Sequence, residues 1–140
     1  MTTQTVGVIG AGTMANGIAQ VSAVAGYRVL MLDINDEALE RGLSALKQNL
    51  ERQVSKQTLS SAQAEAAIAR VQTSTDYSHL NVADIVVEAA TENLDLKLRI
   101  LKQIAQYVRP TCVIATNTSS LSITQLGASV DMPERFIGLH

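Results

Sequence analysis

The sequence has little of what a disulfide framework, a metal cluster or a membrane anchor requires. It contains a single cysteine, Cys112, so no disulfide forms within the chain and no cluster of thiolate ligands can be built. No apolar run approaches the roughly 20 residues that span a bilayer. The first five residues also lack the basic start of a secretory signal. These absences predict a cytoplasmic protein with no membrane contact and no metal site.

Aromatic residues and net charge are also scarce. Aromatic side chains make up 3% of the chain, tryptophan is missing, and the net charge is -2. Nucleic-acid binding through stacked bases or a basic surface is therefore disfavoured. Hydrophobic residues make up 46% of the 140 residues, which is enough for one soluble domain with an aliphatic, alanine-rich core.

Short apolar runs alternate with amphipathic stretches along the chain. Strands are predicted at 6–9, 28–32, 71–74, 83–88, 112–116 and 135–139. Helices are predicted at 14–25, 36–55, 60–69 and 94–108, with a helical turn at 123–126. This alternation predicts an α/β fold, a doubly wound (Rossmann) parallel sheet with a helical excursion after the second strand.

Two of the predicted helices carry a clear apolar spacing. In the first, Met14, Ile18 and Val21 recur at helical spacing, and Gly26 is expected to end the helix in a left-handed cap. In the long second helix, the apolar face is expected to consist of Leu39, Leu43, Leu46 and Leu50. Asn35 or Asp36 is predicted to cap that helix.

A glycine-rich turn follows the first predicted strand and opens the first predicted helix. It reads Gly10-Ala11-Gly12-Thr13-Met14-Ala15. In this context the turn matches the G-x-G-x-x-G/A dinucleotide fingerprint, so we expect residues 10–14 to bind the cofactor. Gly10 would allow a tight turn and Gly12 a close approach of the pyrophosphate, while Ala15 and Gly17 would keep the helix near the sheet. The phosphates would meet the positive end of the helix.

An acidic residue completes the fingerprint. Asp33 ends the second predicted strand 21 residues after Gly12, where a carboxylate can accept hydrogen bonds from the adenosine ribose. The same carboxylate would repel the 2'-phosphate of NADP. The pair of features therefore predicts NAD as the cofactor.

Four blocks occur in order along the chain. They read VGVIGAGTMANGIAQ at 6–20, DIVVEAATENL at 84–94, TNTSSLSI at 116–123 and RFIGLH at 135–140. Together they strongly resemble the NAD-binding domain of the 3-hydroxyacyl-CoA dehydrogenase family, and are most similar to its bacterial 3-hydroxybutyryl-CoA members. The resemblance implies NAD-dependent interconversion of a 3-hydroxyacyl-CoA and a 3-oxoacyl-CoA. One departure is Ala15, where the family more often has glycine.

The resemblance also implies roles for individual residues. Glu92 would lie near the nicotinamide side of the site and Lys97 near the cofactor, although the residues alone would equally suit solvated surface charges. Ser119 would contact both cofactor and substrate, and would be a catalytic as well as a binding residue. His140 would be the general base, because imidazole titrates near neutrality and alcohol oxidation releases a proton.

Three further charged or titratable residues are given smaller roles or none. Lys56, at the end of the long predicted helix, matches a basic position along which the family binds the CoA thioester. Glu88 is expected to be a structural acid at the end of a strand. His79 is expected to be a loop histidine without a function.

The domain organisation and two alternatives follow from the same pattern. Residues 1–140 are expected to be a truncated NAD-binding domain, because the helical C-terminal domain that closes the cleft and forms a homodimer in the family is absent. One alternative is a module that binds NAD without catalysis, since fold and cofactor binding do not imply chemistry. The other is a dehydrogenase of a different 3-hydroxy acid.

Overall fold

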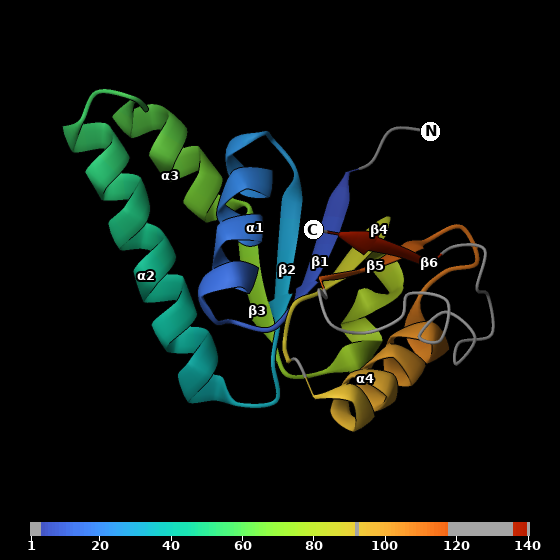
Figure 1. Ribbon diagram of the computed structural model, residues 1–140. Helices are drawn as coiled ribbons and strands as arrows, with labels where there is room; N and C mark the ends of the chain where they lie inside the picture. Colours follow the sequence, from blue (N-terminus) through green and yellow to red (C-terminus); the bar gives the residue numbers. More distant parts are fainter. Residues whose placement is uncertain (1–3, 92, 118–135, 140) are drawn as a thin grey trace.

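The computed structural model describes residues 4–91, 93–117 and 136–139 as an α/β domain (Figure 1). The elements in chain order are β1 (Thr5–Ile9), α1 (Thr13–Val24), β2 (Arg28–Leu32), α2 (Asp36–Ser55), α3 (Ser61–Ala69), β3 (Val71–Ser74), the 3-10 helix η1 (Tyr77–Val82), β4 (Ile85–Glu88), α4 (Leu94–Tyr107), β5 (Val113–Asn117) and β6 (Phe136–Leu139). The boundaries lie within two residues of the predicted ones. The helical turn predicted at 123–126 falls outside the described residues.

The strands form one parallel sheet in the order β3-β2-β1-β4-β5-β6. Helices α1, α2 and α3 lie on one side of this sheet, and α4 lies on the other (Figure 1). The chain changes direction across the sheet between β1 and β4, which are neighbours although they are far apart in sequence. The doubly wound Rossmann fold is therefore confirmed, and its topological switch point lies between the carboxyl ends of β1 and β4.

Side-chain caps explain where three of the helices begin. The Asn35 side chain accepts hydrogen bonds from two backbone N–H groups at the start of α2. Ser60 and Gln63 form a reciprocal capping box on α3, and the Asn93 side chain accepts from the N–H of Leu96 on α4. Such caps satisfy N–H groups that a helix leaves without partners.

The buried face of α1 consists mainly of alanines and not of the larger apolar residues that recur at helical spacing. The side chains that contact the sheet are Ala15, Ala19 and Ala23, whereas Met14 is 57% exposed and Val21 is 70% exposed. The helical spacing of Met14 and Val21 therefore does not mark the buried face, because α1 packs so close to the sheet that methyl groups fill the gap. The packing role expected for Gly17 was wrong, since it is exposed and a Cβ there would meet nothing within 4 Å. Gly26, with φ +108, ends the helix as predicted.

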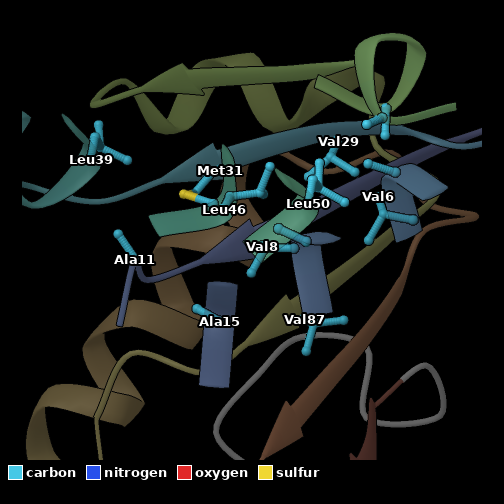
Figure 2. Packing of buried hydrophobic residues seen from close by; sticks show 14 of the residues in the cluster. Val6, Val8, Ala11, Ala15, Val29, Met31, Leu39, Leu46, Leu50 and Val87 are labelled. Carbon is cyan, nitrogen blue, oxygen red and sulfur yellow. The ribbon is translucent and has the colours of Figure 1, made fainter. Parts of the chain in front are cut away.

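The core has one layer on each side of the sheet. On the first side, Met31 of β2 meets Leu46 and Leu50 of α2, as Figure 2 shows, and Leu39 extends this layer. On the second side, Leu80 of η1 packs with apolar residues of α4 and the sheet. The leucine face of α2 is thus confirmed, with Leu43 partly buried. No helix in the described ranges is long and apolar enough to cross a membrane.

The 3-10 helix η1 was not predicted. Sequence patterns indicated a loop around His79, but residues 77–82 form a short helix that Asp76 caps through the N–H of Ser78. Leu80 is fully buried, and a Cβ on Gly7 of β1 would lie 2.9 Å from its side chain. A segment this short has no apolar period, so only its tertiary contacts define it.

Candidate functional site

The glycine-rich turn lies at the carboxyl edge of the sheet, at the switch point. The N–H of Gly10 donates to the carbonyl oxygen of Leu32 at 2.7 Å, and the N–H of Ala89 donates to that of Ile9 at 3.0 Å. Gly10 has φ +115, and a Cβ there would lie 3.1 Å from the Cα of Ala90. Only glycine suits both this dihedral angle and this spacing. The tight turn predicted for Gly10 is confirmed.

The N-terminus of α1 is open, unlike that of the other α-helices. Gly12 is its N-cap, and no side chain caps it, whereas α2, α3 and α4 are each capped by a side chain. A Cβ built on Gly12 would meet nothing within 4 Å. Gly12, Thr13 and Met14 are exposed at this end, and Ala11 is buried beneath them. First-turn N–H groups without a side-chain acceptor form an anion site, which fits the pyrophosphate of a dinucleotide.

Asp33 lies directly after β2, beside the turn. It is half-buried, and its Oδ1 accepts a hydrogen bond from the N–H of Ile34 at 2.7 Å. Its own N–H donates to the carbonyl oxygen of Ser74 at 3.3 Å, which ties it to the end of β3. The carboxylate is therefore held at the edge where the adenosine ribose of a dinucleotide lies in this fold.

Tyr77 is a neighbour of this site that sequence reasoning did not identify. Burial raises the pKa of the Tyr77 phenol, and the negative charges of Asp33 and Glu88 raise it further. The phenol therefore lies in the field of two carboxylates at the same sheet edge and stays protonated at neutral pH. No spacing in the sequence indicated this, because Tyr77 belongs to η1.

Asn16 and Gly42, which sequence reasoning also did not identify, join the start of α1 to α2 beside the glycine-rich turn. The buried Asn16 donates from Nδ2 to the carbonyl oxygen of Gly42 at 2.9 Å. A Cβ on Gly42 would lie 2.9 Å from the carbonyl oxygen of Ala11, so α2 touches the turn at this point. A glycine inside a helical pattern and an asparagine inside an alanine-rich helix were the available sequence signals.

A buried polar cluster lies on the α4 side of the switch point. Glu88 at the end of β4, Lys97 in the first turn of α4 and Thr116 of β5 are each 0% exposed. The Lys97 ammonium forms an ion pair with Glu88 Oε1 and donates to Thr116 Oγ1 at 3.2 Å. The Thr116 hydroxyl donates to Glu88 Oε1 at 2.7 Å, and Glu88 Oε2 accepts from the N–H of Ala90 at 2.8 Å.

The structure brings some of the predicted residues together and separates others. Glu88 ends a strand, as predicted, but Lys97 is buried, so a solvated surface charge is wrong for it. Lys56 caps the far end of α2 and is exposed. Lys56 follows the end of α2 and Asp33 precedes its start, so the two residues lie far apart, because a 20-residue helix rises about 30 Å. His79 is hydrogen-bonded through Nδ1 to the Ser74 hydroxyl at 2.7 Å.

Three predicted residues, Glu92, Ser119 and His140, lie outside the described residues. The strands that precede two of these positions are described. In the parallel pairing of β5 with β6, Asn117 is in register with Leu139 at the carboxyl edge. In the ranges that the structure covers, no three His, Cys, Asp or Glu side chains come together as metal ligands.

Known proteins match this chain over nearly its whole length. The family described as "3-hydroxyacyl-CoA dehydrogenase, NAD binding domain" matches residues 5–140. A 3-hydroxybutyryl-CoA dehydrogenase of Bradyrhizobium diazoefficiens is 41% identical over 135 residues, which are 96% of this chain and 46% of that protein. A 3-hydroxyadipyl-CoA dehydrogenase of Escherichia coli is 42% identical over 137 residues, which are 98% of this chain and 29% of that protein.

A solved structure agrees with the fold. The crystal structure of an (S)-3-hydroxybutyryl-CoA dehydrogenase from Ralstonia eutropha superposes with a TM-score of 0.97 at 50% identity, covering 99% of this chain and 49% of that one. This chain therefore spans about half the length of the 3-hydroxybutyryl-CoA relatives, and the part it spans is the part that binds NAD. The chain belongs to the 3-hydroxyacyl-CoA dehydrogenase family, as its NAD-binding domain.

Proposed function

We propose that this chain is the cofactor half of an enzyme that interconverts (S)-3-hydroxybutyryl-CoA and acetoacetyl-CoA with NAD. The observation that carries the proposal is the open, uncapped N-terminus of α1 beside Gly10 and Asp33, in a chain 41% identical to a 3-hydroxybutyryl-CoA dehydrogenase. When bound, the dinucleotide would supply the hydride acceptor for alcohol oxidation. The protein would supply binding, orientation and proton transfer.

Asp33 and the turn would hold the adenosine and pyrophosphate ends of the cofactor. The N–H groups at the start of α1 would donate to phosphate oxygens, because no side chain occupies them. Asp33 would accept from ribose hydroxyls and would repel a 2'-phosphate, which favours NAD over NADP. The nicotinamide would then extend over the carboxyl ends of β4 and β5.

Ser119 and His140 would act on the substrate. Ser119 would donate a hydrogen bond from its hydroxyl to the substrate oxygen at C3, and Glu92 would lie on the nicotinamide side. His140 would take the proton of the C3 hydroxyl as hydride leaves the same carbon, and would return it in the reverse direction. The register of Asn117 with Leu139 supports the pairing of these roles, because it brings the strand ends before both positions side by side.

Lys56 would contact the CoA part of the substrate, remote from the reacting carbon. It is an exposed cation at the end of α2, where an extended anionic ligand could meet it. The identity of the acyl group follows from similarity less closely than the reaction type does, because one relative at 42% identity is a 3-hydroxyadipyl-CoA dehydrogenase. By its resemblance to the family, the complete enzyme would form a homodimer. Its substrate would be an acyl-CoA.

The test is an absorbance assay of NADH oxidation with acetoacetyl-CoA. Two proteins are compared, namely the 140-residue chain and a chimera in which the second half of the Ralstonia eutropha relative follows His140. The expected result is acetoacetyl-CoA-dependent oxidation by the chimera and little or none by the chain alone, while both bind NADH. A chimera that binds NADH and folds, but oxidises it with neither acetoacetyl-CoA nor 3-oxoadipyl-CoA, would contradict the proposal.

Within the same assay, a His140→Gln chimera separates catalysis from binding. We expect it to bind NADH as the unsubstituted chimera does and to lose turnover, since the general base is removed. Turnover close to that of the unsubstituted chimera would refute the role of His140. Activity with free acetoacetate in place of the thioester would instead favour a dehydrogenase of another 3-hydroxy acid.

A further inference from the structure

The buried cluster of Glu88, Lys97 and Thr116 joins three elements at the carboxyl edge of the sheet. Glu88 ends β4 and is in register with Ile9 of β1 and Thr116 of β5. Lys97 comes from the first turn of α4, so the ion pair pins the start of that helix to two strand ends. We use the name Glu88 network for these three side chains and their hydrogen bonds.

The Glu88 network is costly as a purely structural device. Two full charges are removed from water beneath α4, next to an apolar layer that includes Ile9, Val86 and Ile114. A hydrophobic set of the same volume often stabilises as well or better, because the desolvation of both ions is avoided. Besides the ion pair, the cluster contains hydrogen bonds that fix neighbouring backbone at the carboxyl edge of the sheet.

Those hydrogen bonds fix the backbone directly after β4, in the short segment that leads to α4. Glu88 Oε2 accepts from the N–H of Ala90, and Asn93 caps α4 at the other end of the segment. The Cα of Ala90 would lie 3.1 Å from a Cβ on Gly10, so this segment forms one wall of the glycine-rich turn. Through Thr116, the same carboxylate also fixes the end of β5 directly before Asn117.

We propose that the Glu88 network is a positioning device for the nicotinamide end of the cofactor, an inference that rests on the proposed function. It sets the backbone of residues 89–91 and the end of β5 against the dinucleotide half that reacts. The adenosine half is held separately, by Asp33 and the start of α1. Glu88, Lys97 and Thr116 are thus positioning residues, and their loss should be felt at one end of the cofactor only.

The experiment compares NADH with ADP-ribose, which lacks the nicotinamide. The affinity of each ligand is measured by calorimetry for the unsubstituted chain, for Thr116→Val and for the double variant Glu88→Gln with Lys97→Met. That double variant removes both charges together, so no single buried charge is left behind. Thr116→Ser keeps the hydroxyl and should restore the unsubstituted behaviour.

A second ion pair on the same strand provides the matched control. Asp84, at the amino end of β4, pairs with Arg109, and this pair lies at the opposite edge of the sheet from the cofactor. Asp84→Asn with Arg109→Met removes the same number of charges there. We expect neither NADH nor ADP-ribose affinity to change in this control.

The expected result is a split between the two ligands. In Thr116→Val and in the double Glu88 variant, NADH affinity should fall about tenfold, whereas ADP-ribose affinity should stay within about twofold. In the chimera, kcat should fall while KM for acetoacetyl-CoA holds. Equal losses for both ligands, no loss for either, or failure of Thr116→Val to fold would each overturn the inference.

This outcome is separable from the proposed function. If the unsubstituted chimera oxidises no NADH with either acyl-CoA, the proposed function fails whatever the variants do. If the unsubstituted chimera is active but NADH and ADP-ribose respond alike in the variants, the proposed function stands and the positioning role fails.

Discussion

Strand β4 carries an ion pair at each of its ends, and the two pairs differ in almost every respect. At the amino end, the side chains of Asp84 and Arg109 are 22% and 43% exposed and lie 2.7 Å apart. At the carboxyl end, the side chains of Glu88 and Lys97 are 0% exposed. Asp84 also accepts from the N–H groups of Gln4 and Thr5, so it ties β4 to the start of β1.

The contrast distinguishes the edge at the amino ends of the strands, where the ion pair serves the fold, from the edge at their carboxyl ends, where a dinucleotide binds in this fold. The charges of an exposed pair contribute little to stability, so Asp84 stabilises the fold mainly through its hydrogen bonds with backbone N–H groups. A buried pair carries a large desolvation cost that hydrophobic packing would avoid. The costly pair lies where the topology places the cofactor, and the inexpensive one lies at the opposite edge of the sheet.

The largest expected effect comes from breaking the buried pair on one side. Glu88→Gln alone should lower the free energy of unfolding by about 3–5 kcal/mol, because the buried charge of Lys97 then loses its ion pair with Glu88. Adding Lys97→Met should recover most of that loss. Urea unfolding of both variants measures this, and a loss below about 1 kcal/mol for the single variant would contradict the burial of the pair.

The next effect concerns the turn beside that pair. Gly10→Ala should destabilise the chain by about 1–3 kcal/mol and abolish NADH binding, since φ is +115 and the backbone of residues 89–90 lies within 3.3 Å of a Cβ. Gly26→Ala is the matched control, because Gly26 has φ +108 but an open surrounding. Thermal unfolding should show a smaller loss for Gly26→Ala, and equal losses would mean that the close approach at Gly10 costs nothing.

A third prediction isolates cofactor binding from stability. Gly12→Ala should fold normally, because Gly12 has extended backbone and nothing lies within 4 Å of a Cβ. Its added methyl group would stand where the pyrophosphate approaches, so NADH affinity should drop about tenfold or more. Gly17→Ala, at an equally open position inside α1, should leave affinity unchanged and raise stability by about 1 kcal/mol. Calorimetry would contradict this account if Gly12→Ala bound NADH as the unsubstituted chain does.

The smallest effect is at the amino end of β4, and it depends on pH. Hydrogen bonds from the N–H groups of Gln4 and Thr5, with a smaller contribution from Arg109, hold the pKa of Asp84 below its ordinary value of 3.8. The ionised carboxylate therefore stabilises the fold above that value, and the stabilisation is lost as pH falls through the lowered pKa. Asp84→Asn should cost about 1 kcal/mol at pH 7. The difference should shrink below about pH 4, and a constant difference across pH would contradict it.

Much of the fold and of the glycine-rich turn could be predicted from the sequence, because both depend on local signals. Apolar runs, the caps at Asn35 and Ser60, and the glycines at 10 and 12 each act within a few residues of themselves. The buried face of α1 could not be predicted, since the short distance between α1 and the sheet leaves room for alanine but not for valine.

The buried cluster of Glu88, Lys97 and Thr116 was harder to predict for the same reason. Apart from the family resemblance, nothing in the residues around Lys97 distinguishes it from a surface lysine, because its partners are 9 and 19 residues away in sequence on two different strands. Tyr77 and Gly42 were missed because their roles exist only through contacts between elements. Long-range contacts therefore separate what was predicted from what was not.

The most direct test of the central claim is a calorimetric titration of the 140-residue chain with NADH and, separately, with NADPH. If the uncapped start of α1 and the Asp33 carboxylate form the cofactor site, NADH binds saturably and NADPH binds at least about tenfold more weakly. Asp33→Asn should narrow that difference. Equal affinity for the two cofactors, or no binding of either, would contradict the account.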